Sequence, residues 1–440
     1  MTAPRRRDLA MRILGQRPFV NGAPLDERST DLRDMMRTVG DAGVRPDDLV
    51  ALGGLESRAF VIAVLALWYC EAIPVPDAAR DAATAGAHSA WLVTGDLAIR
   101  RGRASHREPG LSSTAVVHTT SGSTGRPKFV RRGIASVLLE AAGYRESLGL
   151  GPEDRVAVPI PPAHSLGWGT LTSALLSGSD VEIRPFVRPS SLAGSIDAGS
   201  VSVVVMTPPI ARLLVDTRRT GTATPRTALV GAGPVSDGLD RSFRMRFGRE
   251  LLRGYGSTET GGTFVGTTGI GAPLSGVRIA APPRGSEGEL LLEIAAPVEG
   301  YLDAQAPAGV WNTGDVVRHE EDGTVRFVER AAGGLRLNGR FVDVRAVREA
   351  VTGVPGVADL HLLALARPDD PEIQDFYAFV AGAASTDEVL ESLTERAPGE
   401  PIPRVVRCDR IPRTVIGKPD RRAMIEMIGE GDAHDGAGIR

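Results

Sequence analysis

The sequence predicts an α/β protein. We expect a large N-terminal domain of layered α/β subdomains with a small barrel-like β subdomain, followed by a small, mobile α+β C-terminal domain. Up to about residue 235, short runs rich in Val, Ile and Leu alternate with helical patterns, as is typical of buried parallel strands joined by helices. From about residue 290, short strands and hairpins replace this alternation. The small residues at 331–335 then separate a last stretch of roughly 100 residues, which is enough for a small domain.

Three strand–helix–strand units account for most of the predicted N-terminal domain. The first unit is expected to have strands at 49–54 and 73–76 around a helix at 57–70. In the second, strands at 154–161 and 179–186 flank a helix at 165–177. In the third, strands at 201–209 and 226–233 flank a helix at 209–218. The first helix contains the longest apolar run of the chain, residues 59–70. Because twelve residues are too few to span a bilayer, this run is expected to be a buried helix.

The second half of the chain predicts hairpins and then a separate domain. Strands are expected around 288–294 and 310–330, with an Asp-Gly turn at 322–323. The expected boundaries are an N-terminal domain at 1–329, a hinge at 330–334, a C-terminal domain at 335–428 and a disordered polar tail at 429–440. Within the C-terminal domain, helices are expected near 343–353 and 385–397, and strands at 357–366 and 376–381.

Composition and charge exclude several classes of protein. The 440 residues carry a net charge of -3, which leaves no basic surface for nucleic acid. The two cysteines, Cys70 and Cys408, are far apart, as is typical of a reducing compartment, and the seven histidines show no zinc-site spacing. The N-terminus lacks the apolar core of a signal peptide. We therefore expect a cytoplasmic protein that binds neither nucleic acid nor membrane.

A Gly/Ser/Thr-rich stretch at 119–128, TTSGSTGRPK, is the first candidate site. Its glycines permit close approach of the backbone to a ligand, its hydroxyls can donate to phosphate oxygens, and Lys128 adds a positive charge. The spacing does not match a Walker A loop, because Lys128 does not follow Gly125 directly. Taken alone, the stretch is a weak signal, because a Gly/Ser/Thr run is usually a flexible linker.

Seven further segments follow this stretch in a fixed order. They are PPAHSLG at 161–167, GAGP at 231–234, GYGSTETGG at 254–262, GELLLE at 288–293, NTGD at 312–315, LNGRF at 337–341 and IPRTVIGKPDRR at 411–422. In this order and spacing, the set resembles the adenylate-forming superfamily of acyl- and aryl-CoA synthetases and stand-alone adenylation enzymes. The resemblance implies that ATP and Mg²⁺ activate a carboxylic acid as an acyl-adenylate, and that a pantetheine thiol of CoA or of an acyl carrier protein then displaces AMP.

The resemblance implies a role for each matching residue around the nucleotide. The phosphate loop would hold the β- and γ-phosphates through Thr120, Ser121, Gly122, Ser123, Thr124 and Gly125, with Lys128 steering the phosphates. The adenosine would be held by Gly231, Ala232, Gly233, Tyr255, Gly256, Asp315 and Arg330. In this set Tyr255 would stack on adenine, and Asp315 would accept both ribose hydroxyls unless it only closes an Asx turn.

Three residues are the catalytic candidates that the resemblance implies. Thr258 would contact the α-phosphate, Glu259 together with Thr124 would hold Mg²⁺, and Lys418 would bridge the acid's carboxylate and the α-phosphate. The alternative for Lys418 is a solvated surface lysine. Gly339 would line the pantetheine tunnel.

The acid pocket is expected between His164, Trp168, Gly254 and Gly261, although His164 could instead be a structural histidine and Trp168 could simply pack its helix. The resemblance implies that relatives activating α-amino acids carry an aspartate near this motif to pair with the ammonium group. No acidic residue occurs at 161–170, so α-amino acids are disfavoured and a small aryl or short acyl acid is expected. Ala332 and Phe341 depart from the pattern at the hinge and near the tunnel, so the acceptor stays open. An amine acceptor and a non-catalytic ligand-binding protein are the alternatives.

Overall fold

The structure is a computed structural model, and it describes most of the chain. The described residues are 4–55, 57–76, 89–102, 110–120, 128–184, 188–296, 298–304, 309–330, 335–338, 340–367, 370, 372–413, 420 and 423–428. Those up to Arg330 belong to one compact unit and those from Leu335 onwards to a second. Apart from the backbone of Arg330, the predicted hinge at 330–334 lies outside the described residues.

A nine-stranded sheet forms the centre of the first unit, with the order β15-β14-β13-β12-β11-β9-β10-β1-β2. Its strands are β1 (Phe19–Val20), β2 (Ala23–Pro24), β9 (Arg155–Val158), β10 (Asp180–Ile183), β11 (Val203–Met206), β12 (Thr227–Gly231), β13 (Leu252–Ser257), β14 (Gly261–Gly266) and β15 (Ala272–Pro273). All pairs from β1 to β13 are parallel, whereas β2, β14 and β15 pair antiparallel at the edges. The predicted parallel, buried strands are thereby confirmed.

Helices cover both faces of this sheet, and alternate residues of each strand point to opposite sides. Val203 and Val205 of β11 join a core with α1 (Arg6–Gln16), α5 (Ile134–Leu148) and α6 (Ser165–Leu176). On the opposite face, Val204 and Met206 of the same strand pack against α7 (Pro189–Asp197), α8 (Pro208–Val215) and α9 (Asp237–Phe247). Two separate apolar cores therefore sandwich the sheet.

The apolar run at 59–70 lies in helix α3 (Ser57–Tyr69), and residues 60–68 are buried as predicted. The helix packs against α1 and α2 (Thr30–Asp41). It connects β3 (Leu49–Leu52) to β4 (Ile73–Pro76), which form a second sheet with β5 (Trp91–Val93) and β6 (Ile99–Arg101). No helix among the described ranges is long and apolar enough to cross a membrane.

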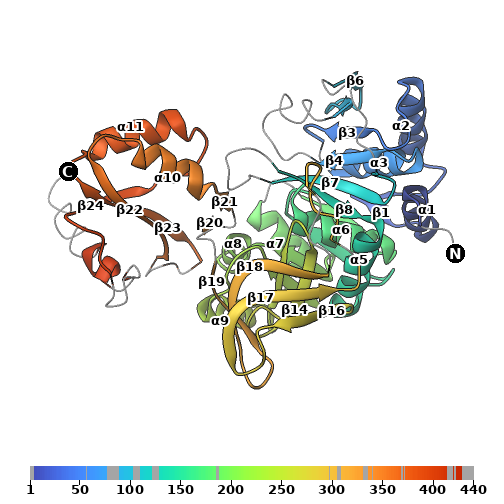
Figure 1. Cartoon of the computed structure of the whole chain (residues 1–440). Helices are drawn as coiled ribbons and strands as arrows, with labels where there is room; N and C mark the ends of the chain where they lie inside the picture. Colours follow the sequence, from blue (N-terminus) through green and yellow to red (C-terminus); the bar gives the residue numbers. More distant parts are fainter. Residues whose placement is uncertain are drawn as a thin grey trace. The chain divides into compact units, whose positions relative to one another are not determined.

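A two-stranded ribbon of β7 (Thr114–Thr120) and β8 (Lys128–Gly133) lies beside β4 and close to α6 (Figure 1). Its two faces have different neighbours. Val117 and Phe129 pack against the apolar residues of β3 and β4. On the other face, His118 contacts α6 and Arg132 contacts α5. The predicted phosphate loop connects these two strands, and its residues 121–127 lie outside the described ones.

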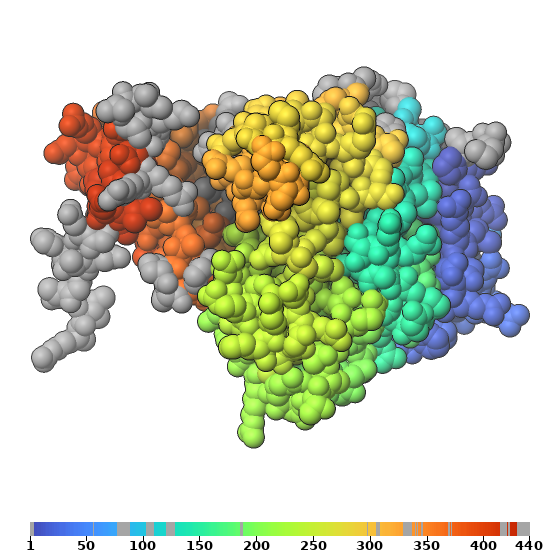
Figure 2. Space-filling view, turned by 90° about the horizontal axis from the view of Figure 1, so that it is seen from below, coloured from blue at the N-terminus to red at the C-terminus, as the bar shows by residue number. Residues whose placement is uncertain are grey.

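Four antiparallel strands form the barrel-like β subdomain that the sequence predicts (Figure 1). They are β16 (Val277–Ala281), β17 (Ser286–Ile294), β18 (Val310–His319) and β19 (Val325–Arg330). The Asp-Gly turn is present, since Gly323 has a φ of 88° and Asp322 Oδ1 accepts from Thr324 N at 2.8 Å. Figure 2 shows residues of α5, in teal, beside this subdomain, in yellow. A Cβ on Gly276 would lie only 2.6 Å from Leu139 of α5.

The second unit is the predicted α+β domain. Its strands are β20 (Leu335–Leu337), β21 (Arg340–Val342), β22 (Val357–Ala366), β23 (Gln374–Gly382) and β24 (Arg404–Cys408). Helices α10 (Val344–Thr352) and α11 (Thr386–Arg396) pack on one face of the β22-β23-β24 sheet. Both begin at capping side chains, because Asp343 accepts from Ala346 N at 3.0 Å and Ser385 accepts from Glu388 N at 3.3 Å.

Arg6 ties the N-terminal helix α1 to the rest of the first unit. Although it belongs to a basic N-terminal segment, it is only 1% exposed. Its guanidinium donates to the carbonyls of Thr114 and Glu71 at 2.5 and 2.6 Å, to Asp47 Oδ1 at 2.7 Å, and to the carbonyl of Leu111. One side chain thereby satisfies groups from three separate segments.

Replacing Arg6 by Ala should lower the free energy of unfolding of the first unit by about 2–5 kcal/mol, because it leaves the buried carbonyls of Thr114 and Leu111 without their donor. Arg12→Ala, on the exposed side of the same helix, should change it by no more than about 0.5 kcal/mol. Urea unfolding followed by circular dichroism measures both. Equal midpoints for the two variants would contradict this account of Arg6.

Candidate functional site

The hairpin of β13 and β14 carries two predicted catalytic residues in its turn. β13 ends at Ser257 and β14 begins at Gly261, so Thr258 and Glu259 lie between the strands. Ser257 N donates to Thr260 Oγ1 and Thr260 N donates to Ser257 Oγ, each at 3.3 Å. Gly261 closes the turn with a φ of 75°, in the region that favours glycine. These local bonds fix Thr258 and Glu259 at the end of the sheet.

Tyr301 contacts two of the predicted site residues. Its hydroxyl donates to Glu259 Oε1 at 2.9 Å, and Nζ of Lys128 lies 5.4 Å from the centroid of its ring. The backbone of Tyr301 also pairs with Val130 of β8. Tyr301 thus brings together the predicted metal ligand and the predicted phosphate-steering lysine, which are far apart in the sequence.

The charge of Glu259 affects the hydroxyl of Tyr301. Burial raises the pKa of Tyr301, and the negative charge of Glu259 raises it further. The phenol therefore stays protonated at neutral pH and keeps donating to the carboxylate. Sequence reasoning missed Tyr301, since a tyrosine after a glycine at 300 carries no pattern of its own.

Tyr255 and Asp315, predicted to bind adenine and ribose, are in direct contact. The hydroxyl of Tyr255 donates to Oδ2 of Asp315, whose residue is only 2% exposed. The Tyr255 ring packs edge-on against Phe264, with the centroids 5.7 Å apart. The structure therefore places the two residues in one site, and it gives Asp315 a phenol as hydrogen-bond donor.

The turn before Asp315 is closed by other side chains. Asn312 Oδ1 accepts from Gly314 N at 2.8 Å, and Thr313 Oγ1 accepts from Asp315 N at 3.1 Å. Gly314 has a φ of 70°. The Asx turn considered for Asp315 thus belongs to Asn312, and the carboxylate of Asp315 points towards Tyr255 instead.

The end of β12 is tightly packed around Gly231. A Cβ at Gly231 would lie 3.0 Å from Leu166 Cδ2 and 3.2 Å from the carbonyl oxygen of Gly254. Ala232 adopts a φ of 63°, and a Cβ on Gly233 would meet Pro208 at 3.1 Å. The small residues of GAGP and Gly254 are therefore needed for this close approach of β12, β13 and α6. Gly256 has the same constraint, since its Cβ would lie 2.1 Å from the carbonyl oxygen of Gly261.

His164 begins helix α6. Its Nδ1 accepts from Leu166 N at 3.3 Å, which is an N-cap contact. The next residue, Ser165, donates to the carbonyl of Ser257 at 3.4 Å and so holds the start of α6 against the end of β13. His164 is half-buried at this junction. The structural function considered for His164 is therefore present, and its place in the acid pocket stays a prediction.

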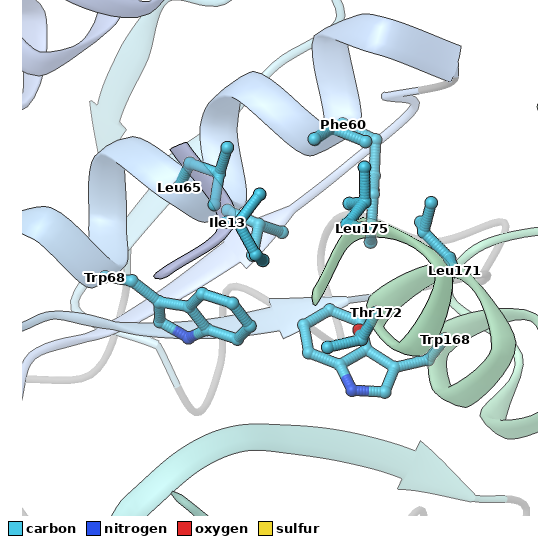
Figure 3. Close-up of a pocket in the computed structure, with 10 residues that line it drawn as sticks. Ile13, Phe60, Leu65, Trp68, Trp168, Leu171, Thr172 and Leu175 are labelled. Carbon is cyan, nitrogen blue, oxygen red and sulfur yellow. The ribbon is translucent and has the colours of Figure 1, made fainter. Parts of the chain in front are cut away.

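Trp168 lies one turn further along α6 and is 1% exposed. Its ring makes edge-to-face contacts with Phe60, Trp68 and His118, at centroid distances of 6.1, 5.8 and 5.2 Å. Figure 3 shows it beside a small apolar pocket between α1, α3 and α6. The packing function that the sequence left open for Trp168 is therefore present.

A buried ion pair lies beside Gly261, one of the residues predicted to line the acid pocket. Arg132 donates to Glu140 Oε2 at 2.9 Å and to Ser136 Oγ at 3.0 Å, and the side chains of the pair are 1% and 3% exposed. Glu140 Oε1 accepts from Gly262 N at 2.7 Å. A Cβ on Gly261 would lie 2.5 Å from Arg132 and 2.6 Å from Glu140.

Two more glycines make room for Glu140 and for its neighbour Tyr144. A Cβ on Gly169 of α6 would lie 2.2 Å from Glu140 Oε1, and one on Gly262 would lie 2.3 Å from the hydroxyl of Tyr144. Burial, followed by the negative charge of Glu140, raises the pKa of Tyr144. Sequence reasoning missed this pair, although a single glutamate within the apolar helical run at 134–144 was a signal for a buried charge.

Several predicted site residues lie outside the described part of the chain. They are Ser121, Gly122, Ser123, Thr124 and Gly125 of the phosphate loop, Gly339, and Lys418. The side chains of Thr120 and Arg330 are likewise outside it, although their backbones belong to β7 and β19. Their assigned functions stay predictions.

Comparisons with known proteins show the family and the fold of this chain. The family model of AMP-binding enzymes matches residues 78–302. CymA of Salinispora arenicola, described as a nonribosomal peptide synthetase, is 31% identical over 72% of this chain, which spans 4% of the length of CymA. Feruloyl-CoA synthase of Amycolatopsis sp is 26% identical over 90% of this chain and 91% of its own.

A solved structure shares the fold. The amide bond synthetase McbA from Marinactinospora thermotolerans superposes with a TM-score of 0.77 at 22% identity, over 94% of this chain and 98% of that one. The layered α/β architecture, the ordered motifs and the matched family model lead to the same conclusion. The chain belongs to the family of AMP-binding enzymes, within the adenylate-forming superfamily.

Proposed function

We propose that the protein uses ATP to convert a small carboxylic acid to its acyl-adenylate and then transfers the acyl group to a pantetheine thiol. The observation that carries this proposal is the hydrogen bond between Tyr255 and Asp315. An aromatic ring suited to adenine and a carboxylate suited to a ribose diol thereby lie at one point of the first unit. The turn with Thr258 and Glu259 follows the end of β13, the strand that carries Tyr255.

The first step joins the acid to the nucleotide. A carboxylate oxygen of the acid attacks the α-phosphorus of ATP, the bond from that phosphorus to the bridging oxygen breaks, and pyrophosphate leaves. Thr258 would donate to the α-phosphate, and Lys128 would attract the phosphates. Lys418 would bring the two anions together, which lowers the electrostatic cost of their approach.

Glu259 fits a magnesium ligand. It is a half-buried carboxylate, a hard oxygen donor of the kind that Mg²⁺ prefers. Because a carboxylate has about four lone-pair positions, the hydrogen bond from Tyr301 leaves capacity for a metal ion. When bound, Mg²⁺ would neutralise charge on the phosphates. Tyr301 would orient the carboxylate through Oε1, as residues behind metal ligands commonly do.

The second step transfers the acyl group. The sulfur of the thiol attacks the acyl carbon, the bond to the phosphate oxygen breaks, and AMP leaves with the electron pair. Similarity to an enzyme named feruloyl-CoA synthase supports CoA as the acceptor. A carrier-protein thiol is the second thiol acceptor, and an amine, which would give an amide, is the alternative. The acid itself is expected to be a small aryl or short acyl acid.

Exchange of labelled pyrophosphate into ATP should occur with at least one acid of a panel of aryl, short acyl and α-amino acids. Exchange requires reversible adenylate formation and no acceptor. ATP binding without exchange for any acid would instead support a non-catalytic binding protein. With an active acid, parallel reactions containing CoA, a pantetheinylated carrier protein or simple amines identify the acceptor. We expect a thioester, and an amide as the sole product would contradict the thiol assignment.

Tyr301→Phe should raise the Mg²⁺ concentration for half-maximal exchange by about tenfold, because Glu259 loses the hydrogen bond that orients it. The ring remains for its contact with Lys128, so the change isolates the hydroxyl. A titration of exchange rate against Mg²⁺ at saturating ATP measures the effect.

Tyr69→Phe is the matched control for this prediction. It also removes a tyrosine hydroxyl that takes part in a hydrogen bond, since the hydroxyl of Tyr69 accepts from Arg7 at 2.7 Å. Its Mg²⁺ dependence should equal that of the unmodified protein. The same dependence in Tyr301→Phe would show that the hydroxyl does not position Glu259.

A further inference from the structure

Three buried side chains next to the predicted acid pocket carry nitrogen atoms that lack hydrogen-bond partners among the described residues. They are both ring nitrogens of His118, Nη1 of Arg132 and Nε1 of Trp168. All three residues are 1% exposed. Buried polar groups in proteins are normally satisfied, and leaving one unsatisfied is destabilising. Their clustering therefore indicates that a further group with a hydrogen-bond acceptor binds beside them.

The three side chains converge from different elements. In the β7–β8 ribbon, His118 pairs with Val130 and Arg132 pairs with Val116, so His118 and Arg132 lie on the same face as diagonal neighbours. Trp168 reaches this face from α6, with its ring centroid 5.2 Å from that of His118. Figure 3 shows the indole nitrogen of Trp168 on the edge of its ring that faces away from Phe60 and Leu171.

The cluster also borders the proposed active site. Arg132 and its partner Glu140 fill the space beside Gly261, which directly follows the turn carrying Thr258 and Glu259. The start of α6 is held against the end of β13 by Ser165. The nitrogen atoms without partners thus belong to side chains beside Gly261 and α6, where the acid pocket is predicted.

The chemistry of the cluster favours a neutral acceptor. Burial lowers the pKa of the His118 imidazole to about 3, with the positive charge of Arg132 as the next cause and His164 as a lesser one. The backbone of Ala163 opposes this shift, but no hydrogen bond of normal geometry joins a His118 ring nitrogen to a described residue. His118 is therefore uncharged at neutral pH, and the charges of Arg132 and Glu140 cancel. A second anion would be buried beside Glu140 with no cation of its own.

We infer that His118, Arg132 and Trp168 bind a neutral acceptor oxygen, such as a hydroxyl, ether or carbonyl, that the acid substrate carries at a distance from its carboxylate. The inference rests on the proposed function and specifies the substrate class. The guanidinium and indole N–H groups can only donate, and neutral imidazole supplies one further donor. Internal water is the competing occupant.

Matched pairs of acids test the inference. The probes are the 2-, 3- and 4-hydroxybenzoic acids against the corresponding methylbenzoic acids, and 3-hydroxybutyric against 3-methylbutyric acid. Affinity is measured by calorimetry in the presence of a non-hydrolysable ATP analogue, so the result does not depend on catalysis. The hydroxyl member of at least one pair should bind about tenfold or more tightly than its methyl partner, because the methyl group leaves the donors unpaired.

Two substitutions should reduce this preference at least threefold. Trp168→Phe removes the indole N–H and His118→Phe removes both ring nitrogens, while each keeps an aromatic ring in the packed cluster. Trp68→Phe is the control, because the indole of Trp68 already donates to the carbonyl of Ala115 at 2.8 Å. It should leave the preference unchanged. Thermal unfolding checks that all three variants are folded.

The outcomes separate this inference from the proposed activity. Three results would overturn it and would indicate that water satisfies the cluster. They are equal or tighter binding of every methyl member, no binding of any hydroxyl-bearing acid, and an unchanged preference in both variants. Selective binding of a hydroxyl-bearing acid without pyrophosphate exchange would uphold it and overturn adenylation instead.

Discussion

The buried ion pair of Arg132 and Glu140 is the constraint on which the rest of the site depends. It joins β8 to α5, and through the amide of Gly262 it joins both to β14. Breaking such a pair costs about 3–5 kcal/mol because an uncompensated charge stays buried. The neighbouring glycines at 169 and 261 are needed because a side chain there would collide with the pair. A charged interaction inside the core thus fixes the positions of the strands that carry the site.

The functional groups are then arranged around that fixed centre. β14 is the second strand of the hairpin whose turn holds Thr258 and Glu259, so anchoring its first residues anchors the turn. Tyr301 reaches Glu259 from the segment before β18, and Tyr255 reaches Asp315 within β18. Glu259 and Asp315 are therefore each positioned by a side chain from another part of the first unit, and a rigid scaffold of this kind suits a reaction that joins two anions.

Much of the fold could be predicted because buried parallel strands and the apolar helix α3 leave local patterns in the sequence. Helices α1 and α5 were not predicted, and each buries a charged side chain, Arg6 or Glu140, through tertiary contacts that leave no pattern in the sequence. The ordered motifs predicted Tyr255 and Asp315 as members of one site, and the structure brings them together.

The contacts that orient this site could not be predicted. Tyr301 reaches Glu259 across 42 positions, and Arg132 reaches Glu140 across a strand–helix boundary, so neither contact follows a helical or strand period. Small residues were visible in the sequence at 261 and 262, but what they make room for was not. Lys418 and the phosphate loop stay predictions from the motif order.

The most direct test of the account concerns the ribose of the bound nucleotide. Calorimetry should show that the protein binds ATP about tenfold or more tightly than 2′,3′-dideoxy-ATP, because Asp315 loses both donors when the ribose hydroxyls are absent. In Asp315→Asn this preference should largely disappear. Equal affinity of the unmodified protein for the two nucleotides would contradict the assignment of Tyr255 and Asp315 as the nucleoside site.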